Sequence, residues 1–272
     1  MSFVLSAGME QLINEITKSL VSIFPNTKGI IQKNNNKYRE LEGLSQTDVI
    51  LFGEIPDEIT VDELGIKLSI SLLDGQKTGY FLDQKINRLK IREFSKDKTV
   101  LDCFCNQGGF ALNSAVGGAK NVVGLDISKS AISSATVNAN LNNLNNCSFE
   151  TVDVFEFLQE AVAKQKKWDV IILDSPSFAK SRKNIATAIK GYSKINSLAM
   201  QCLNDDGYLV SSSCTQLVDE KMFLEMINTT ASKNKKMLKV AYRGMQSPDH
   251  PIITSMKETE YLKFFIFKVE NY

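Results

Sequence analysis

From residue 100 onward, short apolar segments alternate with stretches that have helical spacing. Such segments are typical of β-strands, and strands that alternate with helices predict a parallel, doubly wound α/β sheet. The last two segments are joined by residues 244–259, which show no helical pattern, so we expect a final hairpin with one antiparallel strand. The seven strands of this mixed sheet are expected at residues 100–104, 121–125, 147–152, 169–173, 208–212, 237–242 and 261–269.

The first 75 residues show a different pattern. Apolar residues recur at helical spacing from Gly8 to Phe24, and Pro25 ends this run. Strand-like segments follow at residues 29–32, 49–52 and 65–73, and the polar stretch 34–39 separates the first two. A chain of 272 residues is long enough for one large domain and a small one. We therefore expect a small α+β domain at residues 1–75 and the large domain at residues 76–272.

Composition excludes several classes of function. The 32 Lys and Arg residues balance 31 Asp and Glu residues, so any contact with nucleic acid has to come from local patches of charge. The one histidine, His250, leaves almost no material for a serine or cysteine hydrolase. The five cysteines lack the spacing of a metal site, so we expect no metal. We recognise no leader peptide and no membrane span, and therefore expect a cytoplasmic protein.

The first strand of the large domain leads into a turn that is typical of a cofactor site. Asp102 lies near the end of this strand, and Gly108 and Gly109 lead into the next helix. In such a sheet, ligands bind outside the carboxyl ends of the strands, where a glycine turn lets backbone N–H groups approach them. Asp126, 18 residues after Gly108, is placed to accept hydrogen bonds from ribose hydroxyls.

The sequence of this turn distinguishes between cofactors. Residues 105–110 lack the GxGxxG pattern that admits the pyrophosphate of a nicotinamide dinucleotide. S-adenosylmethionine has a ribose and an adenine but no pyrophosphate, so the shorter turn fits it better. The alternative is a plain strand-to-helix turn with Asp126 as a helix cap. Because Asp102, Gly108 and Asp126 stand at mutually consistent positions, we favour the S-adenosylmethionine site.

Polar residues also follow the next three strands. Asp153 and Val154 could bind the amino group and the ring of adenine, although an Asp at this point is equally a helix cap. Asp174 ends a hydrophobic strand, which is a costly place for a carboxylate. Cys214 ends the strand after it, where side chains face the ligand edge of the sheet. The alternative for Cys214 is a small buried residue.

These motifs form part of a longer pattern, whose stretches are LFGEIP (51–56), KTGYFLDQKINR (77–88), VLDCFCNQGGFAL (100–112), GLDIS (124–128), ILDSPSFAKS (172–181), GYSKINSLAM (191–200), SSCT (212–215) and DHPIITSMKETEYLK (249–263). With them the chain resembles the bacterial family of 23S ribosomal RNA large-subunit methyltransferases that modify cytosine at carbon 5, and their close relatives. The resemblance covers nearly the whole chain. Longer members begin with an RNA-binding PUA domain, for which we find no counterpart here. Their Asp-Pro-Pro after the fourth strand is Asp-Ser-Pro in this chain, at Asp174.

The resemblance implies a Rossmann-like class I methyltransferase that uses S-adenosyl-L-methionine and releases S-adenosyl-L-homocysteine. Residues 77–88 would cross over the cofactor, and Arg88 would pair with its methionyl carboxylate. The alternative for this segment is an interdomain linker with a solvated basic end. The cofactor-binding residues that we expect are Thr78, Phe81, Gln84, Arg88, Asp102, Phe104, Asn106, Gly108, Gly109, Asp126, Ile127, Asp153, Val154 and Asp174.

Methylation at carbon 5 of cytosine implies a covalent mechanism, because this carbon becomes nucleophilic only after a thiolate has added at carbon 6. Cys214 is the expected nucleophile, and Asp174 would hydrogen-bond N3 and the exocyclic amine of the base. Phe178 would stack on the base once it has left its helix. Lys180, Arg182 and Lys183 are either a basic patch for phosphates or a solvated loop. The expected substrate-binding residues are Ser175, Pro176, Phe178, Lys180, Arg182 and Lys183.

The expected partner is RNA, above all ribosomal RNA, with no membrane involved, and the chain would act as a monomer or a homodimer. The small domain would bind or position this RNA. Two other functions stay open. A methyltransferase that acts on a guanine or adenine nitrogen would leave Cys214 a bystander. A catalytically silent RNA-binding assembly factor would need none of these groups, and the intact carboxylates of Asp102, Asp126, Asp153 and Asp174 argue against it.

Overall fold

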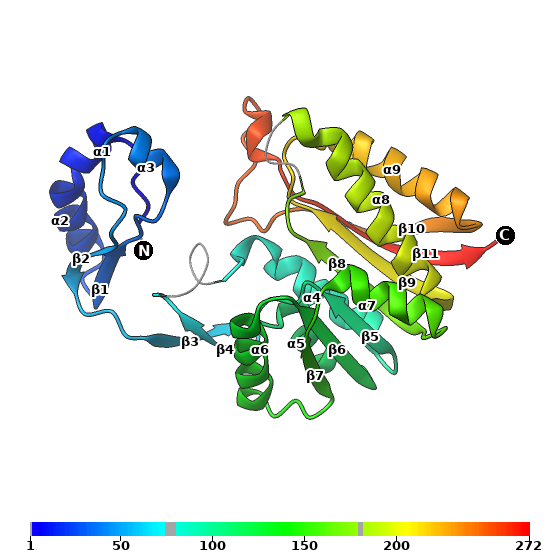
Figure 1. Ribbon diagram of the computed structural model, residues 1–272. Coiled ribbons are helices and arrows are strands. Elements are labelled where there is room, and N and C mark those ends of the chain that lie inside the picture. The colour runs from blue at the N-terminus through cyan, green and yellow to red at the C-terminus, as the bar shows by residue number, and fades with distance from the viewer. Residues whose placement is uncertain (1, 74–79, 179–181) are drawn as a thin grey trace. The chain divides into compact units, whose positions relative to one another are not determined.

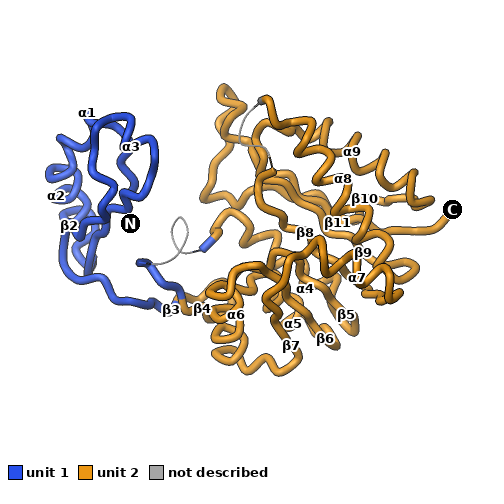
Figure 2. Tube along the Cα trace, viewed as in Figure 1, with its two compact units in different colours: residues 1–60, 70–80 blue, residues 61–69, 81–272 orange. Residues whose placement is uncertain are grey.

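The computed structural model describes residues 2–73, 80–178 and 182–272. The chain divides into two compact units, Met1–Thr60 with Ile70–Tyr80 and Val61–Ser69 with Phe81–Tyr272 (Figure 2). The expected boundary between residues 75 and 76 falls outside the described residues. Within those residues, no helix is both long and apolar enough to cross a membrane.

The second unit is built on a seven-stranded sheet. Its strands are β5 (Thr99–Cys103), β6 (Asn121–Asp126), β7 (Cys147–Thr151), β8 (Trp168–Ser175), β9 (Leu203–Ser213), β10 (Lys236–Gly244) and β11 (Lys263–Asn271). Their order across the sheet is β10-β11-β9-β8-β5-β6-β7, and β5 to β9 are parallel. β11 runs antiparallel to both of its neighbours, β9 and β10. The predicted mixed sheet with one antiparallel strand is thereby confirmed, although β9 begins at Leu203 and not at the predicted Tyr208.

Helices cover both faces of this sheet (Figure 1). They are α4 (Lys85–Ser95), α5 (Gly109–Val116), α6 (Lys129–Leu141), α7 (Val154–Ala163), α8 (Ile185–Gln201) and α9 (Glu220–Lys233). Successive residues of the central strands therefore pack into different cores. Leu101 and Ile171 pack with α7, α8 and α9, whereas Val100 and Ile172 pack with α4 and α5. Burial on both faces explains why these strands are continuous apolar segments in the sequence.

The strand order also fixes where a ligand can bind. β6 and β8 lie on opposite sides of β5, so the chain reverses its direction across the sheet at β5. In open α/β sheets, the crevice at such a reversal, outside the carboxyl ends of the strands, is the usual binding site. The residues that follow β5, β6, β8 and β9 therefore frame the candidate site.

The first unit is small and has both helices and strands. Its elements include α1 (Ala7–Gln11), α2 (Ile13–Ile23), β1 (Gly29–Gln32), α3 (Lys37–Leu41) and β2 (Val49–Gly53). β1 and β2 pair antiparallel. The single helix predicted over residues 8–24 is interrupted at Leu12, which separates α1 from α2. The polar stretch predicted at 34–39 contains the start of α3, where Asn36 caps the helix by accepting a hydrogen bond from Tyr38 N at 2.9 Å.

A further pair of strands was only half predicted. β3 (Glu58–Glu63) and β4 (Ile66–Ser71) form a two-stranded sheet, and the division between the two units runs through both strands. β4 lies inside the predicted strand 65–73, whereas β3 was missed. Leu64 and Gly65 connect them with positive φ angles of 54° and 87°, as a two-residue hairpin turn requires. The sequence signal for β3 was the alternation of Ile59 and Val61 with polar residues.

Candidate functional site

The turn after β5 has an unusual backbone. Phe104, Asn106 and Gly108 all have positive φ, at 62°, 48° and 84°, a conformation that is strained for the two residues with side chains. A Cβ on Gly108 would lie 3.2 Å from the Cβ of Ala135 in α6, so the turn is also closely packed. Gly109 begins α5. Left-handed residues at alternate positions are typical of turns whose backbone N–H groups bind a ligand.

Asp102 is fully buried beside this turn. Its Oδ2 accepts a hydrogen bond from Ala111 N at 2.9 Å, whereas Oδ1 is buried and has no hydrogen-bond partner among the described residues. Burial raises the pKa of Asp102 well above its usual range. A buried acceptor without a donor costs free energy, so Oδ1 marks a position where a donor of a ligand fits.

The carboxylate of Asp126 connects the ends of β5 and β6. Its Oδ2 accepts a hydrogen bond from Asn106 N at 3.0 Å, and its Oδ1 accepts one from Ser128 N at 2.9 Å. The side-chain cap of α6 is Ser128, whose Oγ accepts from Ala131 N, so Asp126 is not the helix cap. Ile127 is 72% exposed. The structure thus brings Asp126 to the strained turn, as the cofactor interpretation expects.

Asp153 follows β7 and caps α7 with one carboxylate oxygen, so the other oxygen can accept a hydrogen bond from a ligand. Its Oδ1 accepts hydrogen bonds from Phe155 N at 2.8 Å and from Glu156 N at 3.0 Å, which caps α7. No hydrogen bond from the described part of the chain reaches Oδ2. Val154 is buried and packs in the core with α7 and α8, so its side chain does not line the ligand edge of the sheet. The two interpretations of Asp153 are therefore compatible.

Asp174, at the end of β8, belongs to a polar network. Its Oδ1 accepts hydrogen bonds from Gln84 Nε2 at 2.8 Å and from Ser212 Oγ. Gln84 in turn accepts a hydrogen bond from Asn87 Nδ2 at 2.7 Å, and Asn87 is fully buried. A Cβ on Gly244 would overlap Asn87 Oδ1, which explains the glycine there. Burial raises the pKa of Asp174 above its ordinary value, and the hydrogen bonds from Ser212 and Gln84 oppose this shift.

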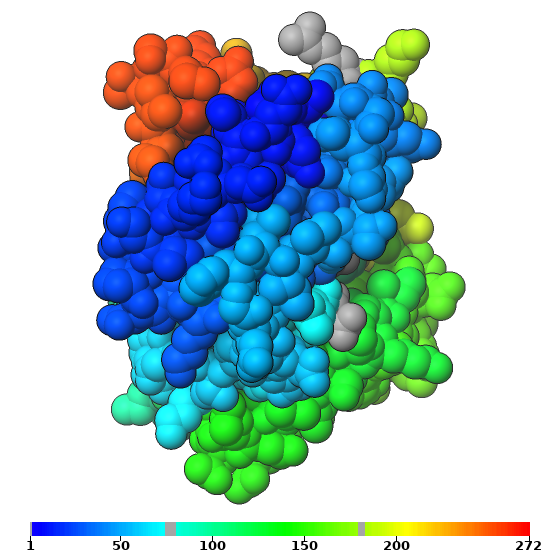
Figure 3. Space-filling view, turned by 90° about the vertical axis from the view of Figure 1, so that its left-hand side faces the viewer, coloured from blue at the N-terminus to red at the C-terminus, as the bar shows by residue number. Residues whose placement is uncertain are grey.

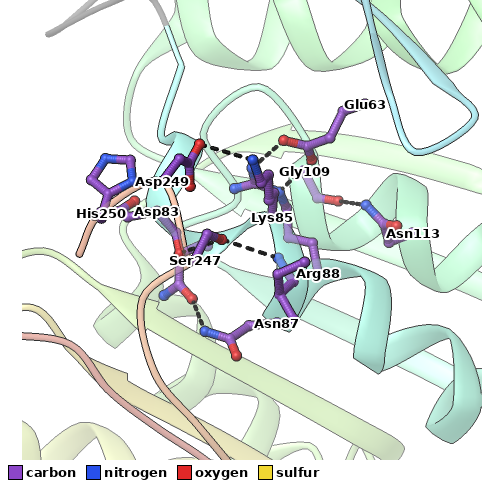
Figure 4. A network of polar contacts seen from close by, with 12 residues as sticks. Glu63, Asp83, Lys85, Asn87, Arg88, Gly109, Asn113, Ser247, Asp249 and His250 are labelled. Carbon is purple, nitrogen blue, oxygen red and sulfur yellow. Dashed lines mark hydrogen bonds and ion pairs between the residues drawn. The ribbon is translucent and has the colours of Figure 1, made fainter. Parts of the chain in front are cut away.

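The guanidinium of Arg88 is occupied. Its Nε and Nη2 donate to the two carboxylate oxygens of Glu63 at 2.8 and 2.6 Å (Figure 4). The two side chains are 4% and 9% exposed, so this is a buried, bidentate ion pair. The planar fork that was expected to bind a methionyl carboxylate thus holds Glu63. Next to it, Lys85 pairs with Asp249 at 2.8 Å (Figure 4).

Cys214 directly follows the last residue of β9 and is exposed, whereas the other four cysteines are buried or half-buried. The neighbouring Thr215 is buried and bonded on several sides. Its Oγ1 lies 2.7 Å from Tyr192 Oη and 3.0 Å from Ser177 Oγ, and its backbone oxygen accepts a hydrogen bond from Lys263 Nζ at 2.7 Å. These contacts fix the backbone that carries Cys214.

The segment before β11 is bonded to the segment before α4. Tyr261 Oη donates to Asp83 Oδ2 at 2.8 Å, and the backbone oxygen of Asp83 accepts from Ser247 N at 2.8 Å. Asp83 belongs to the short 3-10 helix η1 (Leu82–Gln84), which also supplies Gln84 to Asp174. His250 Nδ1 lies 3.3 Å from Asp249 Oδ1, and His250 makes no other side-chain hydrogen bond to a described residue. Residues 82–84 and Tyr261, which belong to two parts of the resemblance pattern, are therefore bonded to each other, and Gln84 connects them to Asp174.

The residues expected to bind the substrate begin with Ser175, the last residue of β8, and continue after this strand. Ser175 is buried and Pro176 is exposed. The ring of Phe178 packs against Tyr192 and Phe155, with ring centroids 4.6 and 6.2 Å apart. Phe178 is therefore used in packing within this structure, and stacking on a base would need its remaining face.

Some of the residues expected to bind the cofactor or the substrate lie outside the part of the chain that the structure describes. Thr78 and Lys180 lie outside the described residues, as does the side chain of Arg182, which begins η2 (Arg182–Asn184). Lys183 is exposed, and Phe81 is half-buried. In the part of the chain that the structure describes, no cluster of His, Cys, Asp and Glu side chains is suited to a metal ion.

Comparison with known proteins assigns the family. A family model described as a methyltransferase domain matches residues 94–266. Ribosomal RNA large subunit methyltransferase I of Tolumonas auensis is 37% identical over 269 residues, which cover 97% of this chain and 68% of the relative. The protein of the same name from Vibrio vulnificus is 38% identical over 271 residues, which cover 98% and 68%.

A solved structure has the same fold. It is a putative methyltransferase complexed with SAH, with a TM-score of 0.82 at 26% identity, and the match covers 95% of this chain and 66% of that one. The predicted Rossmann-like methyltransferase fold is thereby confirmed. The chain is a methyltransferase and belongs to the family of ribosomal RNA large subunit methyltransferase I.

Proposed function

We propose that this chain transfers a methyl group from S-adenosylmethionine to carbon 5 of a cytosine in ribosomal RNA of the large subunit. The observation that carries the proposal is that Asp174 and Cys214 lie at the carboxyl ends of the neighbouring strands β8 and β9. Ser212 pairs in register with Asp174 across β8 and β9, and Cys214 follows two residues later. An exposed thiol and a carboxyl group of raised pKa thus stand at one edge of the sheet. A ribosomal substrate would place the reaction in the cytoplasm.

The residues around the strained turn fit S-adenosylmethionine. Asp102 Oδ1, buried without a donor, would accept a hydrogen bond from the α-amino group of the methionyl part. Asp126 would bind the ribose hydroxyls, and Asp153 Oδ2 would bind the adenine amino group. The similar structure that is complexed with SAH supports S-adenosylmethionine as the cofactor. When bound, S-adenosylmethionine supplies a methyl group on a positively charged sulfur.

Cys214 would act as the nucleophile. Its thiolate adds to carbon 6 of the cytosine, and the electrons of the 5,6 double bond make carbon 5 nucleophilic. Asp174 would hydrogen-bond N3 and the exocyclic amine, and a proton on its carboxyl group would stabilise the charge that develops on the ring. Gln84 and Ser212 hold Asp174 Oδ1, which leaves Oδ2 for the base. Once carbon 5 carries the methyl group, its proton passes to water, the electrons of the C–H bond re-form the 5,6 double bond, and the Cys214 sulfur departs as a thiolate.

The first unit and the loop after β8 would bind the RNA. Phe24 and Tyr38 are exposed in the first unit, and Lys37 Nζ lies 5.7 Å from the centre of the Tyr38 ring (Figure 3 shows this unit in blue). Exposed aromatic side chains beside lysines suit single-stranded nucleic acid, because bases stack on the rings and phosphates bind the ammonium groups. We therefore assign RNA positioning to the first unit, which makes up most of the expected small domain at residues 1–75. We assign methyl transfer to the second unit, which takes in residues 61–69 besides most of the expected large domain at residues 76–272.

The proposal is tested by trapping the covalent intermediate. The enzyme is incubated with S-adenosylmethionine and with large-subunit RNA that contains 5-fluorocytosine, whose fluorine cannot leave as a proton does. We expect an adduct that survives denaturing electrophoresis, and we expect Cys214→Ala to abolish both the adduct and methyl transfer. Cys147→Ala is the matched control, because Cys147 is half-buried in the edge strand β7. Normal methyl transfer by the Cys214→Ala variant would favour a nitrogen methyltransferase instead.

A further inference from the structure

Lys263 is a buried lysine next to the loop that carries Cys214. It begins β11 and pairs in register with Ser213, the residue directly before Cys214. Only 6% of Lys263 is exposed. Its Nζ donates to the backbone oxygens of Thr215 at 2.7 Å and Tyr261 at 2.8 Å. The ammonium group is therefore held by carbonyl groups on both sides, one of them from the residue directly after Cys214.

Two carbonyl oxygens do not compensate the charge of Lys263. An ammonium group has three N–H donors, and the described part of the chain accepts hydrogen bonds from two of them. No carboxylate of a described residue lies within 4.0 Å of Nζ. A buried charge is costly unless an opposite charge pairs with it. Burial lowers the pKa of Lys263, and a charged Cys214 opposes this shift.

We propose that Lys263 is a positioning residue that keeps Cys214 in the thiolate form. The proton moves from Cys214 Sγ to Lys263 Nζ. The sulfur keeps the electron pair of its S–H bond, and the lone pair of the amine forms the new N–H bond. The resulting ammonium group stays bonded to Thr215 and Tyr261. This inference rests on the proposed function, because a nucleophilic Cys214 is what needs a thiolate.

The lowered pKa of Lys263 lies close to that of a free thiol. Burial lowers the pKa of Lys263 to about 8, close to the value of about 8.5 for a free cysteine. The pKa values of Tyr192 and Tyr261, both of which Cys214 influences, are raised by burial, so both phenols are neutral at physiological pH. Carboxylates farther from Nζ also favour its charged form: Asp219, Glu220 and Glu260.

The test measures how fast Cys214 is alkylated by iodoacetamide as a function of pH, with the modified peptide quantified by mass spectrometry. Cys214 is the exposed cysteine, so its reaction can be separated from those of the others. We expect a midpoint at least one pH unit below the value of about 8.5 for a free thiol. Lys263→Met should move the midpoint to that value or above it and slow the reaction at pH 7 by about tenfold.

The matched control is Lys268→Met. Lys268 lies on the same strand, and its ammonium group pairs with Asp206 at 3.2 Å at the surface. This variant should keep the wild-type midpoint. A lysine with a merely structural role would lower the melting temperature when replaced but would leave the midpoint of Cys214 unchanged.

Two results would overturn the inference. One is a wild-type midpoint at or above about 8.5, which needs no variant and so holds even where Lys263→Met does not fold. The other is a folded Lys263→Met protein with the wild-type midpoint. Both differ from failure of the proposed function, which appears as methyl transfer by Cys214→Ala and leaves the alkylation profile of the wild type as it is.

Discussion

Replacement of Glu63 by Gln removes one charge from the buried ion pair with Arg88. Glutamine keeps the shape of the side chain and one acceptor oxygen, but its amide nitrogen would face an N–H group of the guanidinium. One of the two hydrogen bonds, at 2.8 and 2.6 Å in the wild type, is therefore lost. Arg88 stays buried, with its charge no longer compensated by Glu63.

The expected loss of stability is large. Breaking a buried ion pair on one side costs about 3–5 kcal/mol, and a single hydrogen bond to a charged group is worth about 1.5–3 kcal/mol. The positive charge of Arg88 lowers the pKa of Asp102 and of Asp174, and its attraction to these carboxyl groups offsets part of the loss. We therefore expect a decrease of about 3 kcal/mol in the free energy of unfolding, against a total of about 5–15 kcal/mol for an ordinary domain.

Urea unfolding followed by tryptophan fluorescence measures this difference, because the one tryptophan, Trp168, lies in β8 of the same unit. The matched control is Glu93→Gln, which removes the partner of Lys90 from an exposed pair with side chains 63% and 30% exposed. That variant should lose no more than about 1 kcal/mol. A loss below about 1 kcal/mol for Glu63→Gln would refute the assignment of a stabilising buried pair.

Three other predictions concern ligands. Asp126→Ala should weaken the binding of S-adenosylmethionine by about 1–3 kcal/mol in calorimetry, and an unchanged affinity would contradict the ribose assignment. Asp102→Asn should weaken cofactor binding yet raise stability at pH 7. Burial raises the pKa of Asp102 in the folded protein, whereas in the unfolded chain this pKa is near 4. The wild type therefore loses stability as the pH rises above about 4. Chemical unfolding at pH 4 and at pH 7 should show that the variant gains more stability at the higher pH. Replacing Lys180, Arg182 and Lys183 by Ser should flatten the salt dependence of RNA binding and spare the cofactor; an equal salt slope would place the RNA elsewhere.

The sheet of the second unit could be predicted because its strands are locally distinctive. A strand buried on both faces is a short apolar run, and segments such as the one from Val170 to Leu173 are too short for a helix. The elements of the small unit are less clearly marked in the sequence. The interruption between α1 and α2 at Leu12 leaves the helical periodicity of the sequence intact. The acidic residues of β3 weaken the alternation that predicts a strand. These elements depend on contacts more than on local propensity.

The sequence predicts those residues of the candidate site that lie at the carboxyl ends of the parallel strands. It does not predict those that other elements contribute. Asp126, Asp174 and Cys214 end strands, so their positions at one edge of the sheet follow from the alternation alone. Glu63 and Lys263 reach the site from other elements, 25 residues before Arg88 and 49 residues after Cys214. The one sequence feature that indicates Lys263 is its position as a charged residue directly before the apolar run of β11.

The path of the chain between its two units affects how the protein can be divided. Residues 61–69 belong with the methyltransferase unit, although residues 1–60 and 70–80 on both sides of them do not. Lys67 bonds through its backbone to Asn142, which directly follows α6, and Ser69 N donates to Asn138 of α6, while Glu63 pairs with Arg88. A gene fragment that starts at residue 76 would therefore encode an incomplete catalytic unit. A protein nicked between residues 70 and 80 should instead stay associated as two pieces, because residues 61–69 of the first piece remain part of the second.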